Sequence, residues 1–208
     1  MLNIGVLVSG GGTNLQAILD AQDSGIIKSG KVTCVISSSS DAYALERAKK
    51  YGIESVVVDP KQFEAREKFD EAILAALRQH CIDVVVFAGF MYILGETVIK
   101  AYPNKMVNVH PALIPSFCGK GFYGLRVHKA VLEYGVKLTG ATVHFMNEVT
   151  DGGPIILQKA VAVEEGDTPE LLQKRVMEQA EHIILPQAVE LLCAGKLTVE
   201  GRRVVIQQ

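Results

Sequence analysis

The sequence predicts an α/β fold class, namely a doubly wound, mostly parallel sheet with an antiparallel strand pair in the C-terminal part. Short apolar runs rich in β-branched residues alternate with segments of helical periodicity as far as residue 110. Such runs are typical of parallel strands that are buried on both faces. Two later strand-like runs, 139–146 and 155–163, are joined by so few residues that they must pair antiparallel.

The individual elements follow from the same patterns. Five runs are expected to form the parallel strands, at 2–8, 31–37, 55–58, 83–88 and 106–110. Helical spacing and capping residues predict helices at 15–19, 43–51, 63–80, 96–101, 127–134 and 168–194. The last helix starts with Thr168 as N-cap and Pro169 at its first position, and we expect a break or kink near Pro186. Residues 197–208 are expected to form an accessory hairpin.

Length and composition indicate one domain spanning 1–208, because 208 residues suit one well-buried core. The formal charge of −2 provides no general attraction for nucleic acid or for anionic membranes. No apolar run approaches the roughly 20 residues that a membrane-spanning helix needs. The four cysteines are widely scattered, without CxxC spacing, which is typical of reduced thiols. We therefore expect a cytoplasmic protein with small-molecule ligands, and neither a nucleic-acid nor a membrane partner.

A glycine-rich turn follows the first strand and opens the first helix. We call Ser9-Gly10-Gly11-Gly12-Thr13-Asn14 the phosphate turn. Free backbone N–H groups and the helix dipole at such a turn favour an anion. No Gly-Lys-Ser/Thr follows, and Leu15 stands where a dinucleotide fingerprint needs its third glycine. A single phosphate monoester is the better fit, with Thr13 and Asn14 contacting the phosphate or capping the helix; the alternative is a tight turn with an N-cap alone.

Two polar side chains share one face at the end of the last parallel strand. Asn108 and His110 alternate with valines, so a strand turns both to the same side, and Pro111 then ends the strand. Ligands of open α/β sheets gather at this carboxyl edge. An amide and an imidazole placed there suit a developing oxyanion. The alternative is a capping asparagine beside a buried structural histidine.

The antiparallel pair supplies further polar residues. Alternation along 139–146 places Thr142 and His144 on one face, and Asp151 lies in the Asp-Gly-Gly turn that follows. Two histidines and an aspartate can bind Zn²⁺, but their spacing lacks the helical or knuckle pattern of such ligands. A serine hydrolase needs a G-x-S-x-G elbow, which is absent. Direct attack assisted by a His–Asp pair needs neither a metal nor a serine nucleophile.

Three motifs together resemble the folate-dependent formyltransferase family, in the branch that acts on phosphoribosylglycinamide. They are Ser9-Gly-Gly-Gly-Thr-Asn14, Asn108-Val-His110-Pro-Ala-Leu-Ile-Pro115 and Thr142-Val-His144-Phe…Asp151-Gly-Gly-Pro154. The resemblance covers essentially the whole chain. It implies a Rossmann-like formyltransferase fold that acts in purine (IMP) biosynthesis, with 10-formyltetrahydrofolate as the formyl-donor cosubstrate and no metal. Ala112 replaces the serine that usually follows His-Pro in the family, and the loop 116–124 is longer than in some relatives.

The resemblance also implies a role for each matched position. The catalytic residues would be Asn108, His110 and Asp151. Substrate-binding residues would be Gly11, Gly12, Thr13, Asn14 and Glu181. Folate-binding residues would be Arg66, Met91, Tyr92, Ile93, Leu94 and Asn108. Thr142 and His144 would support them, with His144 orienting Asp151. Residues 1–105 would form the phosphate- and ribonucleotide-binding half, 106–195 the catalytic and folate-binding half, and the protein would be a monomer or a homodimer.

The implied reaction is direct attack of the glycinamide amine on the formyl carbon, through a tetrahedral intermediate. Asn108 and a protonated His110 would stabilise its oxyanion, and Asp151 is expected to raise the pKa of His110. Two alternatives remain open: a formyltetrahydrofolate hydrolase, which releases formate without an amine acceptor, and a non-catalytic mononucleotide-binding module.

Overall fold

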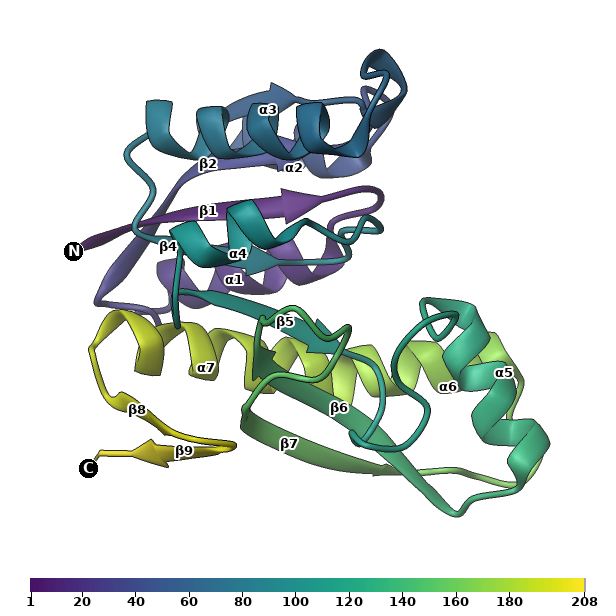
Figure 1. Cartoon of the computed structure of the whole chain (residues 1–208). Helices are drawn as coiled ribbons and strands as arrows, with labels where there is room; N and C mark the ends of the chain where they lie inside the picture. Colours follow the sequence, from purple (N-terminus) through teal and green to yellow (C-terminus); the bar gives the residue numbers. More distant parts are fainter. Residues whose placement is uncertain (208) are drawn as a thin grey trace.

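Seven strands form one sheet in the computed structural model, which describes residues 1–207. These strands are β1 (Leu2–Val8), β2 (Gly30–Ser37), β3 (Glu54–Val57), β4 (Val84–Phe87), β5 (Met106–His110), β6 (Leu138–Phe145) and β7 (Ile155–Ala162). Their order is β3-β2-β1-β4-β5-β6-β7, in which β1 to β5 pair parallel and β6 and β7 pair antiparallel. The arrowheads of β1, β2 and β5 accordingly point the same way in Figure 1. The predicted fold class is confirmed.

Helices cover both faces of this sheet. They are α1 (Thr13–Asp23), α2 (Tyr43–Lys50), α3 (Arg66–Gln79), α4 (Glu96–Ala101), α5 (Leu125–Tyr134), α6 (Pro169–Val176) and α7 (His182–Cys193). A 3-10 turn at Pro60–Gln62 precedes α3, so that helix begins at Arg66 and not at residue 63 as expected.

The alternation of side chains along the strands divides the core into two layers. In β1, Ile4, Val6 and Val8 belong to the cluster that contains α1, α2, α5, α6 and α7 residues, whereas Leu7 belongs to the cluster with α3 and α4 residues. Both layers are visible in Figure 1, with α3 and α4 on one side of the strands and α1 and α7 on the other. The continuous apolar runs of the sequence reflect this burial on two faces.

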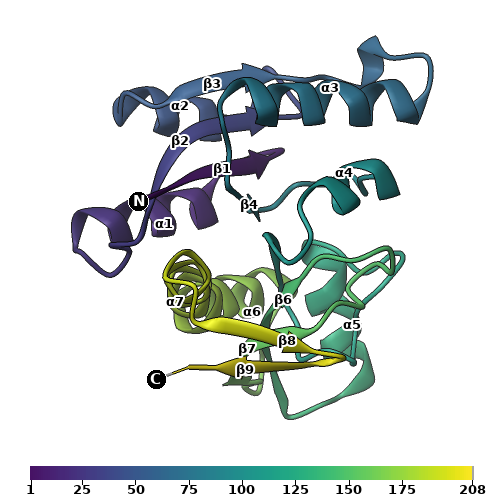
Figure 2. The same cartoon turned by 60° about the vertical axis from the view of Figure 1, so that its left-hand side comes forward.

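The C-terminal segment is a separate antiparallel hairpin. It consists of β8 (Leu197–Glu200) and β9 (Arg203–Ile206), which pair only with each other in the described residues. Figure 2 shows the hairpin beside α7 and β7. The expected hairpin is therefore present as far as Gln207, and Gln208 lies outside the described residues.

The long C-terminal helix is interrupted at a different place from the one expected. A π turn at Met177–Glu181 separates α6 from α7, whereas α7 continues through Pro186. Pro186 is the fifth residue of α7, so the N–H that it lacks would bond only to the first residue of that helix. The expected break or kink near Pro186 is therefore misplaced: the α-helical pattern is interrupted at Met177–Glu181, which ends five residues earlier. The π turn contains a candidate ligand residue, Glu181, and such turns often occur at functional sites.

The strand order reverses direction between β1 and β4. Successive strands from β1 run outward on one side to β3, and the chain then returns to place β4 on the other side of β1. A crevice forms at such a switch point, outside the carboxyl ends of the strands. The phosphate turn follows β1, the loop 88–95 follows β4, and β5 ends at His110. All three segments therefore meet at one edge of the sheet.

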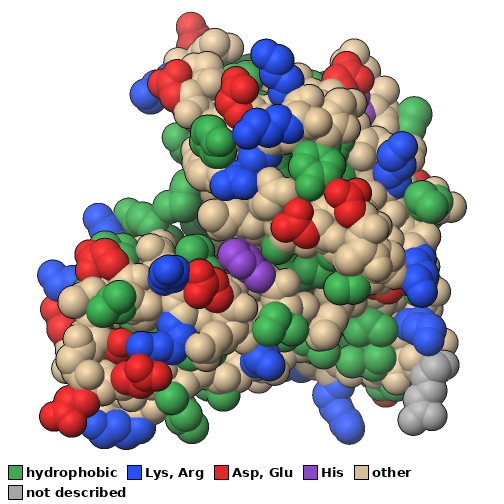
Figure 3. Space-filling view, turned by 180° about the vertical axis from the view of Figure 1, so that it is seen from behind, with side chains coloured by type: hydrophobic (Ala, Val, Ile, Leu, Met, Phe, Trp, Pro, Cys, Tyr) green, Lys and Arg blue, Asp and Glu red, His purple; other side chains and the backbone are tan. Residues whose placement is uncertain are grey.

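The surface carries charges of both signs. Lys and Arg side chains alternate with Asp and Glu side chains over the face seen in Figure 3, in keeping with the small net charge. Among the helices described for residues 1–207, none has the length and apolarity needed to cross a bilayer.

Candidate active site

A cavity of about 500 Å³ lies at the carboxyl edge of the sheet. The phosphate turn, the loop after β4, the end of β5 and the turn between β6 and β7 all contribute to its walls. The residues predicted from sequence that line it are Gly11, Gly12, Thr13, Asn14, Met91, Tyr92, Ile93, Leu94, Asn108, His110, Asp151 and Glu181. The fold thus brings together the phosphate turn, the loop after β4, and the polar side chains at the end of β5.

Strand pairing assembles the polar cluster. In the antiparallel register of β5 and β6, Asn108 lies opposite His144 and His110 lies opposite Thr142. Asp151, in the turn after β6, places its Oδ2 atom 3.6 Å from His110 Nδ1 and its Oδ1 atom 3.7 Å from His144 Nε2. These five side chains come from three segments, yet they share one face of the sheet edge.

His144 is hydrogen-bonded to Asn108. Its Nδ1 atom lies 2.9 Å from the carbonyl oxygen of Phe145, so Nδ1 carries the proton and donates. In this tautomer Nε2 is an acceptor, and the Asn108 amide nitrogen, 3.3 Å away, donates to it. His144 therefore orients the Asn108 amide, and the same Nε2 atom lies 3.7 Å from Asp151 Oδ1.

His110 lies between two hydrogen-bond acceptors. Its Nε2 atom is 2.8 Å from the Phe117 carbonyl oxygen, and its Nδ1 atom faces Asp151. Burial lowers the pKa of His110 below its ordinary value, and the Asp151 carboxylate and the Phe117 carbonyl, which both favour the charged form, offset this only in part. Asp151 thus raises the pKa of His110 as expected, but the larger effect of burial makes the net shift downward.

Asp151 remains ionised in this environment. Burial alone would raise its pKa, but His144, His110 and the Gly119 N–H, which donates to Oδ2 at 2.8 Å, hold that pKa below its usual value. The backbone of Asp151 is in the left-handed region, with φ at +53°. Aspartate and asparagine tolerate this conformation better than most other residues with a side chain.

Thr142 supports the segment that follows His110. Its hydroxyl donates to the Ala112 carbonyl at 2.7 Å and accepts from the Ile114 N–H at 3.1 Å. Gln158 on β7 adds a hydrogen bond to the same oxygen at 2.9 Å. Thr142 thus holds the chain in place where it leaves the strand.

The phosphate turn begins α1 without a side-chain cap. Gly12 is the N-cap residue, in the left-handed region with φ at +70°, and neither Thr13 nor Asn14 caps the helix. The capping role offered as an alternative for these two residues is therefore wrong. Thr13 lies with its hydroxyl 3.8 Å from the sulfur of Met177, and Asn14 donates from its amide nitrogen to Glu181 Oε2 at 2.7 Å.

The π turn brings Glu181 to the phosphate turn. Gln173, Met177 and Glu181 all line the cavity, at intervals of four residues along α6 and the π turn. Glu181 is 5% exposed, and burial raises the pKa of its carboxyl to about 7, although the Asn14 amide opposes this shift. Glu181 therefore changes charge near neutral pH.

This shift predicts a pH dependence of folding stability. Between the ordinary pKa of 4.5 and about 7, folded Glu181 holds a proton that the unfolded chain has released, so the free energy of unfolding decreases as pH rises through this window. Glu181→Gln should remove this slope and stabilise the protein at pH 8 by on the order of 3 kcal/mol. The glutamine amide can also donate to Asn14 Oδ1, which is buried without a partner among residues 1–207. Urea denaturation at pH 5 and pH 8 measures the effect.

A control for this measurement lies on the same turn. Glu178 is exposed, with only a surface contact of 3.9 Å to Lys174, so Glu178→Gln should leave the pH slope unchanged. A slope that persists in Glu181→Gln would assign the titration to another group.

The loop after β4 forms one wall of the cavity. Met91 donates its backbone N–H to Ser9 Oγ at 2.9 Å, which ties this loop to the phosphate turn. Met91, Tyr92 and Ile93 are exposed, whereas Leu94 is buried. Phe69 on α3 packs against Tyr92 with ring centroids 5.7 Å apart, so α3 supports the loop from behind.

Arg66 lies at the start of α3 and is not among the described residues that line the cavity. Its side chain is exposed, and its Nε atom is 3.8 Å from Asp70 Oδ2. Asp70 in turn accepts a hydrogen bond from the Gly95 N–H at 2.9 Å. The fold thus places Arg66 near the far end of the loop wall, away from the polar cluster.

Some lining residues give little signal in the sequence. His128 on α5 is fully buried, and neither of its ring nitrogens has a hydrogen-bond partner among residues 1–207. Burial, together with His110, lowers the pKa of His128 to about 4, so it is neutral. A lone histidine on a helix carries no pattern that could identify it. The spacing of Gln173, Met177 and Glu181 is a signal that sequence analysis could have used.

Across residues 1–207, no three His, Cys, Asp or Glu side chains gather in a way that could hold a metal ion.

The fold and the site define an α/β protein with a phosphate-type turn and an Asn–His–Asp cluster at one switch-point crevice. Residues 2–189 match the family model described as formyl transferase, and the chain belongs to this family. It is 40% identical over 196 residues to a phosphoribosylglycinamide formyltransferase of Escherichia coli (strain K12), covering 94% of this chain and 89% of the relative. The chain spans only about a fifth of the length of the trifunctional purine biosynthetic proteins of Gallus gallus, Bos taurus and Homo sapiens.

Solved structures show the same relationship. A glycinamide ribonucleotide transformylase 1 from Symbiobacterium toebii superposes with a TM-score of 0.94 at 46% identity, covering 100% of this chain and 95% of the other. A formyltetrahydrofolate deformylase from Pseudomonas syringae pv. tomato superposes with a TM-score of 0.87 at 26% identity, and only 66% of that chain is covered.

Proposed function

We propose that this protein transfers the formyl group of 10-formyltetrahydrofolate to the amine of N1-(5-phospho-D-ribosyl)glycinamide, in purine biosynthesis. The observation that carries the proposal is one cavity walled by the phosphate turn, the apolar loop after β4 and the Asn108–His110–Asp151 cluster. Relatives matched over most of their length carry the names phosphoribosylglycinamide formyltransferase and glycinamide ribonucleotide transformylase, which supports this substrate pair.

In this proposal the ribonucleotide occupies the side of the cavity formed by α1 and the π turn. The N–H groups of the phosphate turn hold its phosphate, since the start of a helix favours an anion. Glu181, hydrogen-bonded to Asn14, lies next to this turn and suits the ribose hydroxyls as an acceptor.

The folate occupies the other side, along the loop after β4. Met91, Tyr92 and Ile93 present exposed apolar surface and main-chain groups to a flat ring, and the buried Leu94 anchors the loop. Arg66, exposed beyond the end of this wall, suits the negatively charged glutamate tail that leaves the cavity.

The chemistry follows from the polar cluster. The substrate amine attacks the formyl carbon, a C–N bond forms, and the former carbonyl oxygen gains negative charge. Asn108 and the imidazolium form of His110 donate to this oxyanion, for which His110 Nε2 exchanges its bond to the Phe117 carbonyl for the substrate oxygen. Asp151 accepts the proton that the amine releases and passes it, directly or through water, to N10 of the folate. The bond between N10 and the formyl carbon then breaks, the carbonyl re-forms, and a formamide and tetrahydrofolate result.

One assay distinguishes this proposal from two alternatives, a hydrolase and a mononucleotide-binding module. Purified protein is given 10-formyltetrahydrofolate with and without glycinamide ribonucleotide, and tetrahydrofolate and formate are both measured. We expect tetrahydrofolate only when the ribonucleotide is present, and no formate. Formate release without the ribonucleotide would favour a hydrolase, as in the deformylase with the same fold. No folate turnover under either condition would favour a mononucleotide-binding module.

We also propose that residues 1–208 act as one domain, with the 196–208 hairpin accessory. Residues 1–105 would contribute most of the ribonucleotide contacts and 106–195 the catalytic cluster, in a cytoplasmic monomer or homodimer. The single sheet that runs through both halves supports one domain. Each half also contributes to the other half's ligand, because Met91 from 1–105 lies on the proposed folate side of the cavity and Glu181 from 106–195 lies on the ribonucleotide side. Analytical ultracentrifugation distinguishes the monomer from the homodimer.

A further inference from the structure

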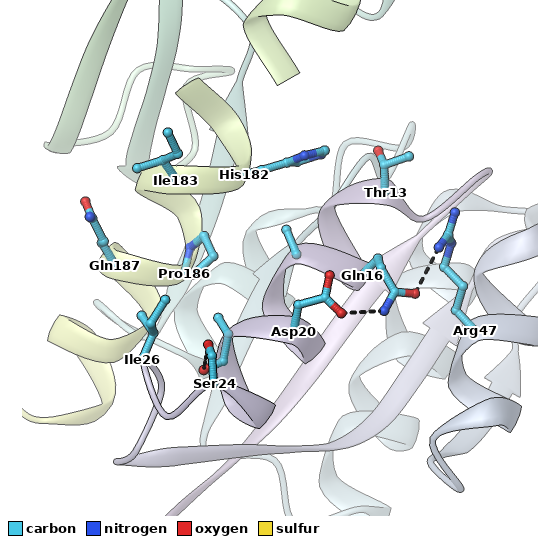
Figure 4. Close-up of a pocket in the computed structure, with 12 residues that line it drawn as sticks. Thr13, Gln16, Asp20, Ser24, Ile26, Arg47, His182, Ile183, Pro186 and Gln187 are labelled. Carbon is cyan, nitrogen blue, oxygen red and sulfur yellow. Dashed lines mark hydrogen bonds between the residues drawn. The ribbon is translucent and has the colours of Figure 1, made fainter. Parts of the chain in front are cut away.

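The outer side of the phosphate turn faces helix α2 and a groove of about 540 Å³ between α1 and α7. Figure 4 shows this groove, with Arg47 at one end and a chain of hydrogen bonds from Arg47 through Gln16 to Asp20. Arg47 lies on α2 and lines this groove, and it is not among the described residues of the active-site cavity. Its Nε atom contacts the phosphate turn from outside the active-site cavity.

Three carbonyl groups of the phosphate turn are held by donors outside the cavity. The Gly10 carbonyl accepts from the Ala44 N–H at 3.1 Å, the Gly11 carbonyl accepts from Arg47 Nε at 2.9 Å, and the Gly12 carbonyl accepts from the Gln16 N–H at 2.9 Å. Two of these donors are backbone groups of helices. Arg47 is the one side chain that holds a carbonyl of this turn in the described residues.

Each fixed carbonyl also fixes the direction of the following N–H. In a planar trans peptide the C=O of one residue and the N–H of the next point in opposite directions. Since the Gly11 carbonyl points outward to Arg47, the Gly12 N–H points inward, toward the cavity that Gly12 lines. The same holds for the Gly11 N–H through the bond between Gly10 and Ala44.

Helix α2 lies close enough to leave the turn little room for another arrangement. A Cβ atom on Gly12 would lie 2.7 Å from the Cβ atom of Ala44, so only glycine fits there. Arg47 is itself fixed, because Nη1 donates to Gln16 Oε1 at 2.9 Å and its guanidinium lies 5.1 Å from the centroid of the Tyr43 ring. A guanidinium group serves such a site better than an ammonium because it donates in two fixed directions at once.

We propose that Arg47 is a positioning residue for the phosphate site: it fixes the peptide plane between Gly11 and Gly12 and thereby aims the Gly12 N–H at the phosphate of the substrate. The inference rests on the proposed function for the identity of the substrate. It deepens that function by assigning part of the ribonucleotide affinity to a side chain that does not touch the ribonucleotide.

The test compares Arg47→Gln with Arg47→Lys in steady-state kinetics. Arg47→Gln should raise the KM for the ribonucleotide about tenfold, as expected for weakening one hydrogen bond to a charged group. The kcat and the KM for the folate should stay within twofold, because the catalytic cluster and the loop after β4 are not held by Arg47. Arg47→Lys retains one donor and should recover part of the ribonucleotide affinity.

Lys50 provides a matched control for the loss of positive charge. It lies on the same helix, 5.8 Å from the centroid of the same Tyr43 ring, and Lys50→Gln should leave both KM values unchanged. The proposal is overturned if Arg47→Gln leaves the ribonucleotide KM unchanged, if both KM values rise together, or if Lys50→Gln has the same effect as Arg47→Gln. An unchanged thermal unfolding midpoint in Arg47→Gln confirms that the fold is retained.

Calorimetric titration with ribose 5-phosphate separates this inference from the proposed function. Wild-type protein should bind this phosphate ester about tenfold more tightly than Arg47→Gln does, whether or not formyl transfer occurs. Absence of formyl transfer with this difference intact would overturn the proposed function alone. Equal affinities in an active enzyme would overturn the role of Arg47 alone.

Discussion

Asp151→Asn should lower kcat about 10³-fold, within the range that general acid–base catalysis typically contributes. The carboxylate is the acceptor proposed for the amine proton, and it faces His110 Nδ1 at 3.6 Å. An amide cannot take up that proton, and it removes the negative charge that favours the imidazolium form of His110. The Kd for the ribonucleotide should change by less than threefold, because the hydrogen bonds and ion pairs of Asp151 in the described residues involve Gly119, His110 and His144 and not the phosphate turn.

Asparagine is chosen so that the backbone conformation at position 151 stays unchanged. The φ angle of Asp151 is +53°, which asparagine adopts almost as readily as aspartate. Asp23→Asn removes an exposed carboxylate far from the cavity and should retain full activity. If Asp151→Asn turned over at a rate close to that of Asp23→Asn, the proposed His–Asp chemistry would be wrong.

Asn108→Ala should lower kcat by about 10²–10³-fold, the usual cost of removing one oxyanion donor. The amide is oriented by its hydrogen bond to His144 Nε2 at 3.3 Å and is presented to the cavity from the end of β5. Its contribution is made only when charge develops on the formyl oxygen, so the KM for the ribonucleotide should change little. Single-turnover measurements of formyl transfer report this step directly.

Asn104 is a suitable control for the loss of an amide near β5. It is exposed, and its φ angle of +54° accommodates glycine, so Asn104→Gly should keep both stability and activity. Equal loss of ground-state affinity and turnover in Asn108→Ala would indicate a binding role in place of stabilisation of the transition state.

Local patterns suffice to predict the parts of the site that depend on a strand and its end. Asn108 and His110 are separated by one valine and followed by proline, so their common face and their place at the sheet edge follow from the strand itself. The phosphate turn is equally local, since its glycines lie between a strand and a helix. The antiparallel pair follows from its short connection.

The remaining features depend on contacts between distant segments. The bond between Asn108 and His144 requires the register of β5 with β6, which no pattern within either strand specifies. The net lowering of the His110 pKa depends on how deeply the assembled site buries the ring, which the strand pattern alone does not specify. The place of the π turn was missed because Pro186 was the only cause of an interruption visible in the sequence, whereas α7 continues through this proline.

The loop 116–124 reaches the polar cluster through its main chain. The Phe117 carbonyl oxygen contacts His110, and the Gly119 amide contacts Asp151. Both contacts depend on left-handed backbone angles at Phe117 and Gly119, and the φ angle of +88° at position 119 favours glycine. A side chain at position 119 would therefore strain the loop, and a single inserted or deleted residue would shift both groups. Loop length and the glycine at position 119 are together the heritable constraint on how this cluster is covered.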